Sequence, residues 1–178
     1  MAMMDKPLVI AKVHKYMRQL RKNGHKVNNI PRAITLNYNN ICNFKCEFCF
    51  SAEADNAHLK EALDFDTIRR IADEADKLGI WEIVLTGGEL LVQPDNLFRL
   101  IAAFDASRFQ MVIITNGYLL DEKMAYNLAA AGIDCVGVSL SGMDEREHMR
   151  SRGGRTGFPC QSIKSIRQCG GSWYGCVA

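Results

Sequence analysis

Residues 34–49, ITLNYNNICNFKCEFC, join a predicted strand to three closely spaced cysteines. Residues 34–38 alternate apolar and polar side chains, which is typical of a β-strand. The strand runs directly into Cys42, Cys46 and Cys49, so a loop at its carboxyl end carries all three thiols. We call residues 39–49 the cysteine loop. Its thiols are close enough in the sequence to bind one soft metal centre.

Downstream of the cysteine loop, short apolar runs alternate with amphipathic segments. Three runs predict buried strands, at residues 83–85, 111–115 and 135–140. Helices are predicted between them, from Asp64 or Asp66 through Leu78, from Pro94 to about residue 104, and from Asp121 to about residue 131. Strand, turn and helix in repeated order indicate a parallel α/β fold, with residues 172–178 as a candidate fifth strand.

Each chemically distinctive turn follows the carboxyl end of a predicted strand. These turns are Thr86-Gly87-Gly88-Glu89, Thr115-Asn116-Gly117 and Ser139-Leu140-Ser141-Gly142. In parallel α/β folds, whether the sheet is open or closed, such loops line a common ligand crevice. The cysteine loop and the three turns are therefore predicted to converge on one site.

The seven cysteines of this 178-residue chain are unevenly spaced. An odd number argues against a fully paired disulfide framework, and three cysteines within eight residues favour metal ligation in a reducing compartment such as the cytoplasm. Closed zinc sites normally use four ligands, often from two Cys-x-x-Cys pairs, and no second pair is present. Iron–sulfur clusters are also held by thiolates, so the spacing favours a cluster and leaves zinc as the alternative.

Composition favours a soluble globular protein, because 48% of the residues are hydrophobic and 24% are charged. No apolar run approaches the roughly 18 residues that span a bilayer. The first 35 residues carry eight of the Lys and Arg residues and one acid, so this end is basic. Residues 8–22 predict a docking helix with a solvated basic face, and an anionic partner is the alternative. No base-reading motif or glycine-rich phosphate fingerprint accompanies the charge.

The order of these motifs resembles the radical S-adenosylmethionine (radical SAM) superfamily. The Cys-x3-Cys-x2-Cys spacing, with Phe48 before the last cysteine, is similar to the cluster motif of that family, and Gly87-Gly88-Glu89 resembles its Gly-Gly-Glu motif. The turns after the third and fourth strands are weaker matches. The sequence departs from the family at two positions. Leu90 replaces the usual proline, which is expected to loosen the turn, and Ser141 replaces the usual aspartate.

The resemblance implies a partial (β/α)6 barrel with four to five βα units over residues 33–178, after a basic helix and lead-in at residues 1–32. It implies a 4Fe-4S cluster on Cys42, Cys46 and Cys49, whose fourth iron is open to SAM. The residues expected around the cofactor are Phe48, Gly87, Gly88, Glu89, Thr115, Asn116, Ser139 and Arg152. By resemblance, the Gly-Gly-Glu motif holds the methionine amino group. The resemblance also makes Ser139 and Arg152 the candidates for binding the carboxylate and ribose region, with Arg150 as the competing arginine.

The implied activity is reductive cleavage of SAM to a 5′-deoxyadenosyl radical that abstracts hydrogen from a peptide or small-metabolite substrate. Flavodoxin or ferredoxin would supply the electron, and no protein nucleophile is needed. The family barrel has six units, so we expect a fragment or a chain completed by a partner. The alternative is a non-catalytic iron–sulfur or zinc protein that serves as a binding partner.

Outside the cysteine loop, Cys135 is expected to be a buried hydrophobe, and His148 a partly exposed helix residue. Cys160, Cys169 and Cys176 lack a tight pair, so an auxiliary cluster is the less favoured interpretation of them.

Overall fold

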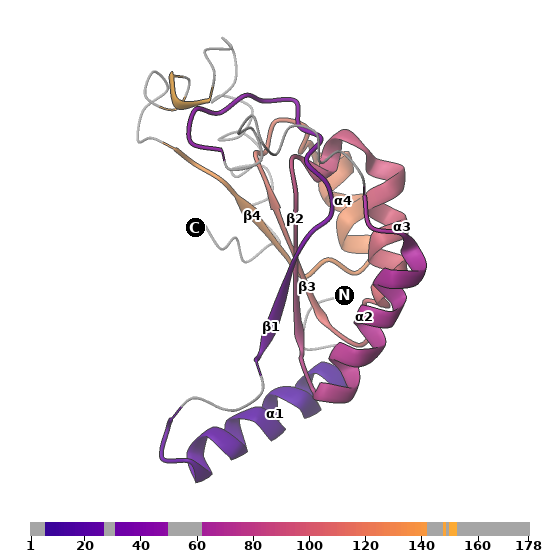
Figure 1. The fold of residues 1–178 in the computed structure, drawn as a ribbon. Helices are drawn as coiled ribbons and strands as arrows, with labels where there is room; N and C mark the ends of the chain where they lie inside the picture. Colours follow the sequence, from indigo (N-terminus) through magenta and orange to yellow (C-terminus); the bar gives the residue numbers. More distant parts are fainter. Residues whose placement is uncertain (1–5, 27–30, 50–61, 142–147, 149, 153–178) are drawn as a thin grey trace.

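The computed structural model describes residues 6–26, 31–49, 62–141, 148 and 150–152. Four parallel strands form one sheet in chain order: β1 (Ala33–Asn37), β2 (Glu82–Thr86), β3 (Gln110–Thr115) and β4 (Cys135–Val138). The connecting helices are α2 (Phe65–Leu78), α3 (Pro94–Phe104) and α4 (Glu122–Ala130). All three cover the same face of the sheet (Figure 1).

This one-sided arrangement distinguishes a barrel wall from an open sheet. A doubly wound sheet reverses its strand order and places helices on both faces. Here the order β1-β2-β3-β4 never reverses, and successive crossovers of one hand place the three connecting helices on one side. The predicted partial barrel of parallel strands is confirmed. The candidate fifth strand at residues 172–178 lies outside the described residues.

The helix ends follow the capping residues that the sequence contains. The Asp64 side chain accepts a hydrogen bond from the Thr67 amide at 2.8 Å and begins α2, which ends at Gly79 with φ 82°. Asp121 caps α4 in the same way through the Met124 amide, at 2.7 Å. Both capped helices pack on the outer face of the sheet. The capping residues in the sequence therefore set where the helices that cover this face begin and end.

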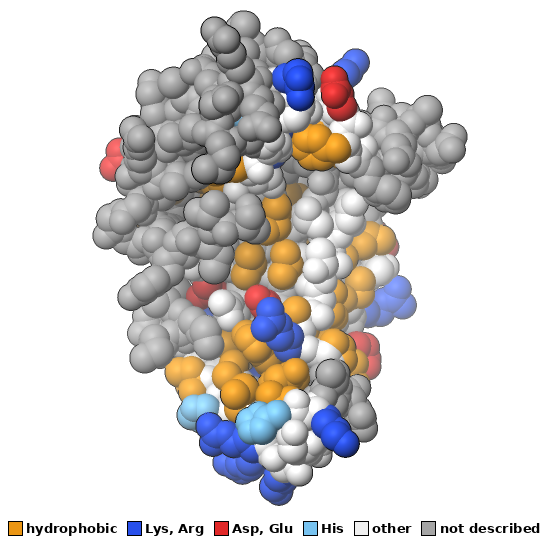
Figure 2. Space-filling view, turned by 90° about the vertical axis from the view of Figure 1, so that its left-hand side faces the viewer, with side chains coloured by type: hydrophobic (Ala, Val, Ile, Leu, Met, Phe, Trp, Pro, Cys, Tyr) orange, Lys and Arg blue, Asp and Glu red, His pale blue; other side chains and the backbone are white. Residues whose placement is uncertain are grey.

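The two faces of the sheet differ in burial. Alternate residues of β2 and β3 point toward the helices and are fully buried: Ile83, Leu85, Met111 and Ile113. They pack with Ile68, Leu97, Leu100, Phe104 and Phe109 into one core. The intervening Val84, Val112 and Ile114 are only half-buried. Figure 2 views the face without these helices and shows hydrophobic side chains along its middle. This face corresponds to the interior of the barrel.

Helix α1 (Pro7–Lys22) docks at the amino ends of the strands (Figure 1). Lys6 precedes it and is 1% exposed, and Lys12 forms an ion pair with Asp76 on α2. The predicted docking helix therefore anchors partly through its lysines, not only through an apolar face. On this helix Val9 is fully buried, whereas Met17 is 39% exposed.

Candidate functional site

The carboxyl ends of the four strands surround one pocket of about 170 Å³. Each predicted loop contributes to it, as expected for parallel strands. The lining residues are Cys42, Phe44, Cys46, Phe48, Cys49, Thr86, Gly87, Gly88, Ile114, Thr115, Asn116, Ser139 and Arg152. Of the predicted site residues, Glu89 does not line the pocket. The competing arginine, Arg150, is exposed and does not line it either.

The glycine pair after β2 lets the cysteine loop approach the sheet. The Gly88 amide donates to the Asn39 carbonyl at 2.7 Å, and the Glu89 amide donates to the Ile41 carbonyl at 2.7 Å. A Cβ atom on Gly88 would lie 2.1 Å from the Ile41 carbonyl oxygen, and one on Gly87 would lie 2.8 Å from that of Asn39. Neither gap admits a side chain. Glycine is therefore required here by close backbone contact.

Glu89 lies behind the pocket wall and joins β2 to the turn after β3. One carboxylate oxygen accepts from the Leu91 amide at 3.0 Å and the Thr115 hydroxyl at 2.8 Å, and the other accepts from the Asn116 amide at 2.7 Å. Burial raises the pKa of this carboxyl, while the three hydrogen bonds favour its charged form. Glu89 is therefore a structural link between two loops of the site.

Leu90 stands where the family usually has proline. It is 4% exposed and begins a short 3-10 helix, η3 (Leu90–Val92). The Val92 amide donates to the Glu89 carbonyl at 3.2 Å. Apolar burial and this hydrogen bond hold the turn without the ring of proline.

Asn116 ties the turn after β3 to the cysteine loop. Its Nδ2 donates to Asn43 Oδ1 at 2.9 Å, and its Oδ1 accepts from the Tyr118 amide at 3.0 Å. The Tyr118 ring also meets Phe44 edge-on, with 6.0 Å between the ring centroids. Asn43 was not identified from the sequence, because its place between two cysteines carries no signal of a partner more than 70 residues away.

The three thiols of the cysteine loop are unpaired by disulfides and half-buried. Cys42 Sγ accepts from the Phe44 amide at 3.3 Å. Desolvation raises the pKa of the Cys42 and Cys46 thiols, and the Arg152 guanidinium acts against this rise at Cys46. Soft thiolate ligands suit iron–sulfur clusters and zinc.

No three donors among the described residues gather around a point that could hold a single metal ion. A mononuclear zinc site needs such convergence, because each thiolate must lie about 2.3 Å from the same ion. A multi-iron cluster binds each thiolate on a different iron, so its ligands stand farther apart. The three thiols line one pocket with the strand-end turns, and thiolates are ligands that either kind of centre can use.

Arg152 connects the end of β4 with the cysteine loop. It is 8% exposed and donates to the Ser139 carbonyl at 2.7 Å and to Ser141 Oγ at 2.9 Å. Its third contact is with Cys46 Sγ at 4.0 Å, and the Phe48 ring centroid lies 5.6 Å from the guanidinium carbon. The structure thus brings Ser139 and Arg152 together, through the serine backbone.

His148 differs from the expectation of a partly exposed helix residue. It is 2% exposed, and its Nδ1 accepts from the Ser141 amide at 3.1 Å. Burial lowers the pKa of this imidazole, with the Arg152 charge as a smaller cause in the same direction. Its contact with the turn after β4 accompanies this burial, which the helical spacing of His148 alone could not show.

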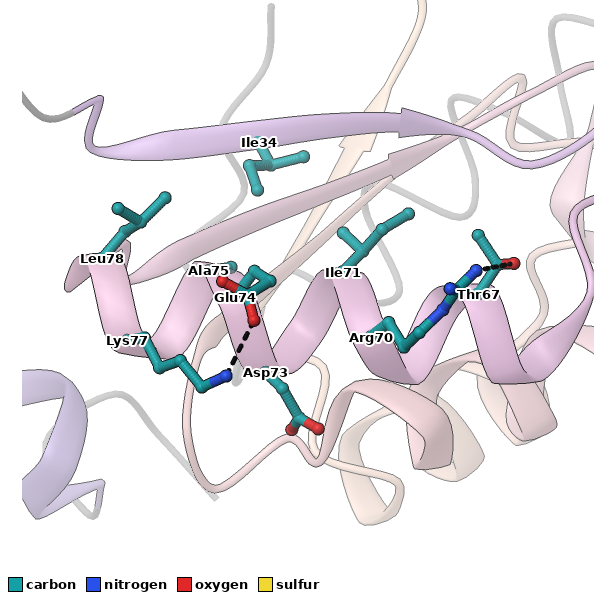
Figure 3. Close-up of a pocket in the computed structure, with 9 residues that line it drawn as sticks. All are labelled: Ile34, Thr67, Arg70, Ile71, Asp73, Glu74, Ala75, Lys77 and Leu78. Atoms are coloured by element: carbon teal, nitrogen blue, oxygen red, sulfur yellow. Dashed lines mark hydrogen bonds and ion pairs between the residues drawn. The ribbon is translucent and has the colours of Figure 1, made fainter.

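A second hollow of about 580 Å³ lies between β1 and α2, away from the strand carboxyl ends. In Figure 3, Ile71 and Leu78 point from α2 toward Ile34, whereas the charged side chains point away. Two of these, Lys77 and Glu74, form an exposed ion pair. The hollow combines apolar walls with solvated charges and brings together none of the predicted site residues.

Comparison with known proteins identifies the family of this chain. The model of the Radical SAM superfamily matches residues 36–177. This chain belongs to the radical SAM superfamily. Among the described residues, no helix is long and apolar enough to cross a membrane.

Curated relatives have several different activities. The chain is 33% identical to a PqqA peptide cyclase of Granulibacter bethesdensis over 138 residues, 77% of this chain and 36% of that protein. It is 36% identical to a GTP 3′,8-cyclase of Geobacter sulfurreducens over 123 residues, 67% and 36% of the two chains. An AdoMet-dependent heme synthase of Methanosarcina barkeri is 31% identical over 70% of this chain and 35% of its own length. The chain therefore spans about a third of the length of these relatives.

Solved structures share the fold. SuiB of Streptococcus suis, bound to the precursor peptide SuiA, superposes with a TM-score of 0.63 at 23% identity, covering 86% of this chain and 33% of SuiB. Methylornithine synthase (PylB) gives a TM-score of 0.66 at 17% identity, covering 95% and 48%. Identities this low show the radical SAM fold and leave the substrate open.

Proposed function

We propose that this chain is a radical SAM enzyme, or the N-terminal part of one, that holds a 4Fe-4S cluster on Cys42, Cys46 and Cys49. The observation that carries the proposal is the pocket in which the three thiols meet the turns after β2, β3 and β4. Three thiolates leave one iron of a cubane without a protein ligand, where SAM can bind. Bound together, the cluster and SAM supply reductive cleavage of SAM to a 5′-deoxyadenosyl radical that takes hydrogen from the substrate.

The residues around the pocket then bind and orient SAM. Gly87 and Gly88 expose backbone at the pocket wall. Glu89 links two loops and orients this backbone and the Thr115-Asn116 turn. In the family, the corresponding glutamate contacts the methionine amino group directly. Phe48, Thr115 and Asn116 line the same pocket and shape it around the cofactor.

Ser139 and Arg152 are proposed to receive the carboxylate and ribose region of SAM. A guanidinium has five N–H donors. Three point at Ser139, Ser141 and Cys46 in contacts among the described residues, which leaves donors for an anion in the pocket. A fork of fixed N–H groups suits bidentate binding of a carboxylate.

We propose a peptide or a small metabolite as the substrate. The relatives support this class, since one is a peptide cyclase, one a GTP cyclase, and the SuiB structure contains a precursor peptide. An electron donor such as flavodoxin or ferredoxin, and a cytoplasmic location where thiols stay reduced, complete the proposal.

Anaerobic reconstitution tests the function directly. Purified chain is loaded with iron and sulfide, reduced with dithionite in the presence of SAM, and assayed for 5′-deoxyadenosine. We expect about four irons per chain and product above the level of a Cys46→Ala control. An intact cluster that yields no 5′-deoxyadenosine under strong reduction would refute SAM cleavage by this chain and favour a non-catalytic binding protein.

A further inference from the structure

Arg152 is the side chain through which the end of β4 reaches the cluster ligands. On one side it is fixed by the Ser139 carbonyl and Ser141 Oγ, at 2.7 and 2.9 Å. On the other side it meets Cys46 Sγ at 4.0 Å and the Phe48 ring. The guanidinium cannot swing away from the thiol without breaking both hydrogen bonds to the turn after β4.

The backbone strengthens the same connection. The Glu47 amide donates to the Ser151 carbonyl at 3.2 Å, so the residues beside Cys46 and Arg152 are joined directly. The Ser151 hydroxyl in turn donates to the His148 carbonyl at 2.9 Å. These contacts hold the positive charge at a defined distance from one cluster ligand.

The charge is also poorly screened by water. Arg152 is buried, and Cys46 is half-buried beside it. Interactions between charges weaken much less in such surroundings than on the protein surface. Glu89 is an opposing charge that acts on Cys42, and Glu47, which follows Cys46 in the loop, is exposed to solvent. The two sides of the thiol set therefore face charges of opposite sign.

We propose that Arg152 raises the reduction potential of the cluster through its fixed charge beside Cys46. This inference rests on the proposed function, because it requires a cluster on the three cysteines. Reduction adds one electron to the cluster, and a nearby positive charge stabilises the more negative product. Net charge and hydrogen bonds to the ligating sulfurs are known determinants of iron–sulfur potentials. Arg152 is a positioning residue in this role, distinct from its proposed contact with SAM.

The test measures the midpoint potential of the reconstituted cluster without SAM, by redox titration followed by electron paramagnetic resonance. Arg152→Gln and Arg152→Met remove the charge, and Arg152→Lys keeps it. We expect a more negative midpoint in both neutral variants and a midpoint near wild type in Arg152→Lys. Arg150→Gln is the matched control, because that exposed arginine lies two residues away and is screened by solvent. Its midpoint should equal that of the wild type.

A wild-type midpoint in either neutral variant with full iron and sulfide content would overturn the inference. Loss of the cluster in all three variants would overturn it as well, because Arg152 would then hold the loop and not tune the potential. Loss in the neutral variants alone, with Arg152→Lys at the wild-type midpoint, would also overturn it, because the charge would then be needed for cluster assembly and not for the potential. Failure of the wild-type chain to take up a 4Fe-4S cluster refutes the proposed function itself.

Discussion

The two ends of the sheet both bury charged groups, but they use them differently. At the amino end, the Lys6 ammonium donates to the Phe109 and Gly132 carbonyls, at 3.0 and 2.9 Å, and pairs with Asp134. Its three N–H donors are all used. At the carboxyl end, Arg152 and three half-buried thiols line a pocket and keep capacity for a ligand. Lys6, whose donors are all used within the protein, therefore has a structural role, whereas Arg152, which lines a pocket, can contact a ligand.

The largest effect is expected from the thiols. Cys42→Ala, Cys46→Ala and Cys49→Ala should each abolish cluster assembly, because each removes one of the three proposed protein ligands. Cys135→Ala is the matched control, since Cys135 lies at the amino end of β4 and is 8% exposed. Iron and sulfide analysis after reconstitution measures the outcome. Equal iron loss in the Cys135 variant would contradict the assignment of iron binding to the carboxyl end of the sheet alone.

Lys6→Met tests the structural end. It leaves the Asp134 carboxylate buried without its cation, and breaking a buried ion pair in this way costs about 3–5 kcal/mol. Urea unfolding of the apoprotein measures the change, with exposed Lys15→Met as the control, expected within about 0.5 kcal/mol of wild type. The folded fraction should still bind iron. A stable Lys6→Met variant that cannot take up iron would contradict a purely structural role for the amino end, because iron binding would then depend on Lys6.

Gly88→Ala tests the close contact beneath the cysteine loop. The added methyl group would lie 2.1 Å from the Ile41 carbonyl oxygen, so the loop must shift. Overpacking of this kind costs about 1–3 kcal/mol, and the displaced thiols should lose much of their iron. Gly79→Ala is the control: its φ of 82° strains alanine by about 1 kcal/mol, but no atom lies within 4 Å. Unchanged iron binding in the Gly88 variant would argue against the contact.

The smallest effect concerns pH and Glu89. Burial raises the pKa of this carboxyl in the folded protein, so the folded state binds its proton more tightly than the unfolded state. Stability should therefore fall as pH rises from the ordinary glutamate pKa through the raised value. Glu89→Gln removes this contribution, and its pH profile, measured by urea unfolding, should be flatter over that window. Parallel profiles would show that Glu89 is not the titrating group.

Much of the site could be predicted from short-range signals. The cysteine spacing, the Gly-Gly-Glu motif and the strand-end turns are contiguous in the sequence, and parallel strands bring such turns together. Pairings across the fold could not be predicted. The Asn116 to Asn43 and Arg152 to Cys46 contacts join residues 73 and 106 positions apart, and no local pattern specifies such partners.

By itself, the sequence determined the strand and helix order, the capped helix ends and the three thiols of one loop. These follow from hydrophobic periodicity, from Asp64 and Asp121 at helix starts, and from local spacing. Only the tertiary structure decided that Glu89 faces a neighbouring loop and that Arg152 lies against Cys46. It also decided that the Lys6 ammonium is fully hydrogen-bonded to groups within the protein. The physical reason is that the direction and burial of a charged side chain depend on which distant backbone groups the folded sheet brings within reach.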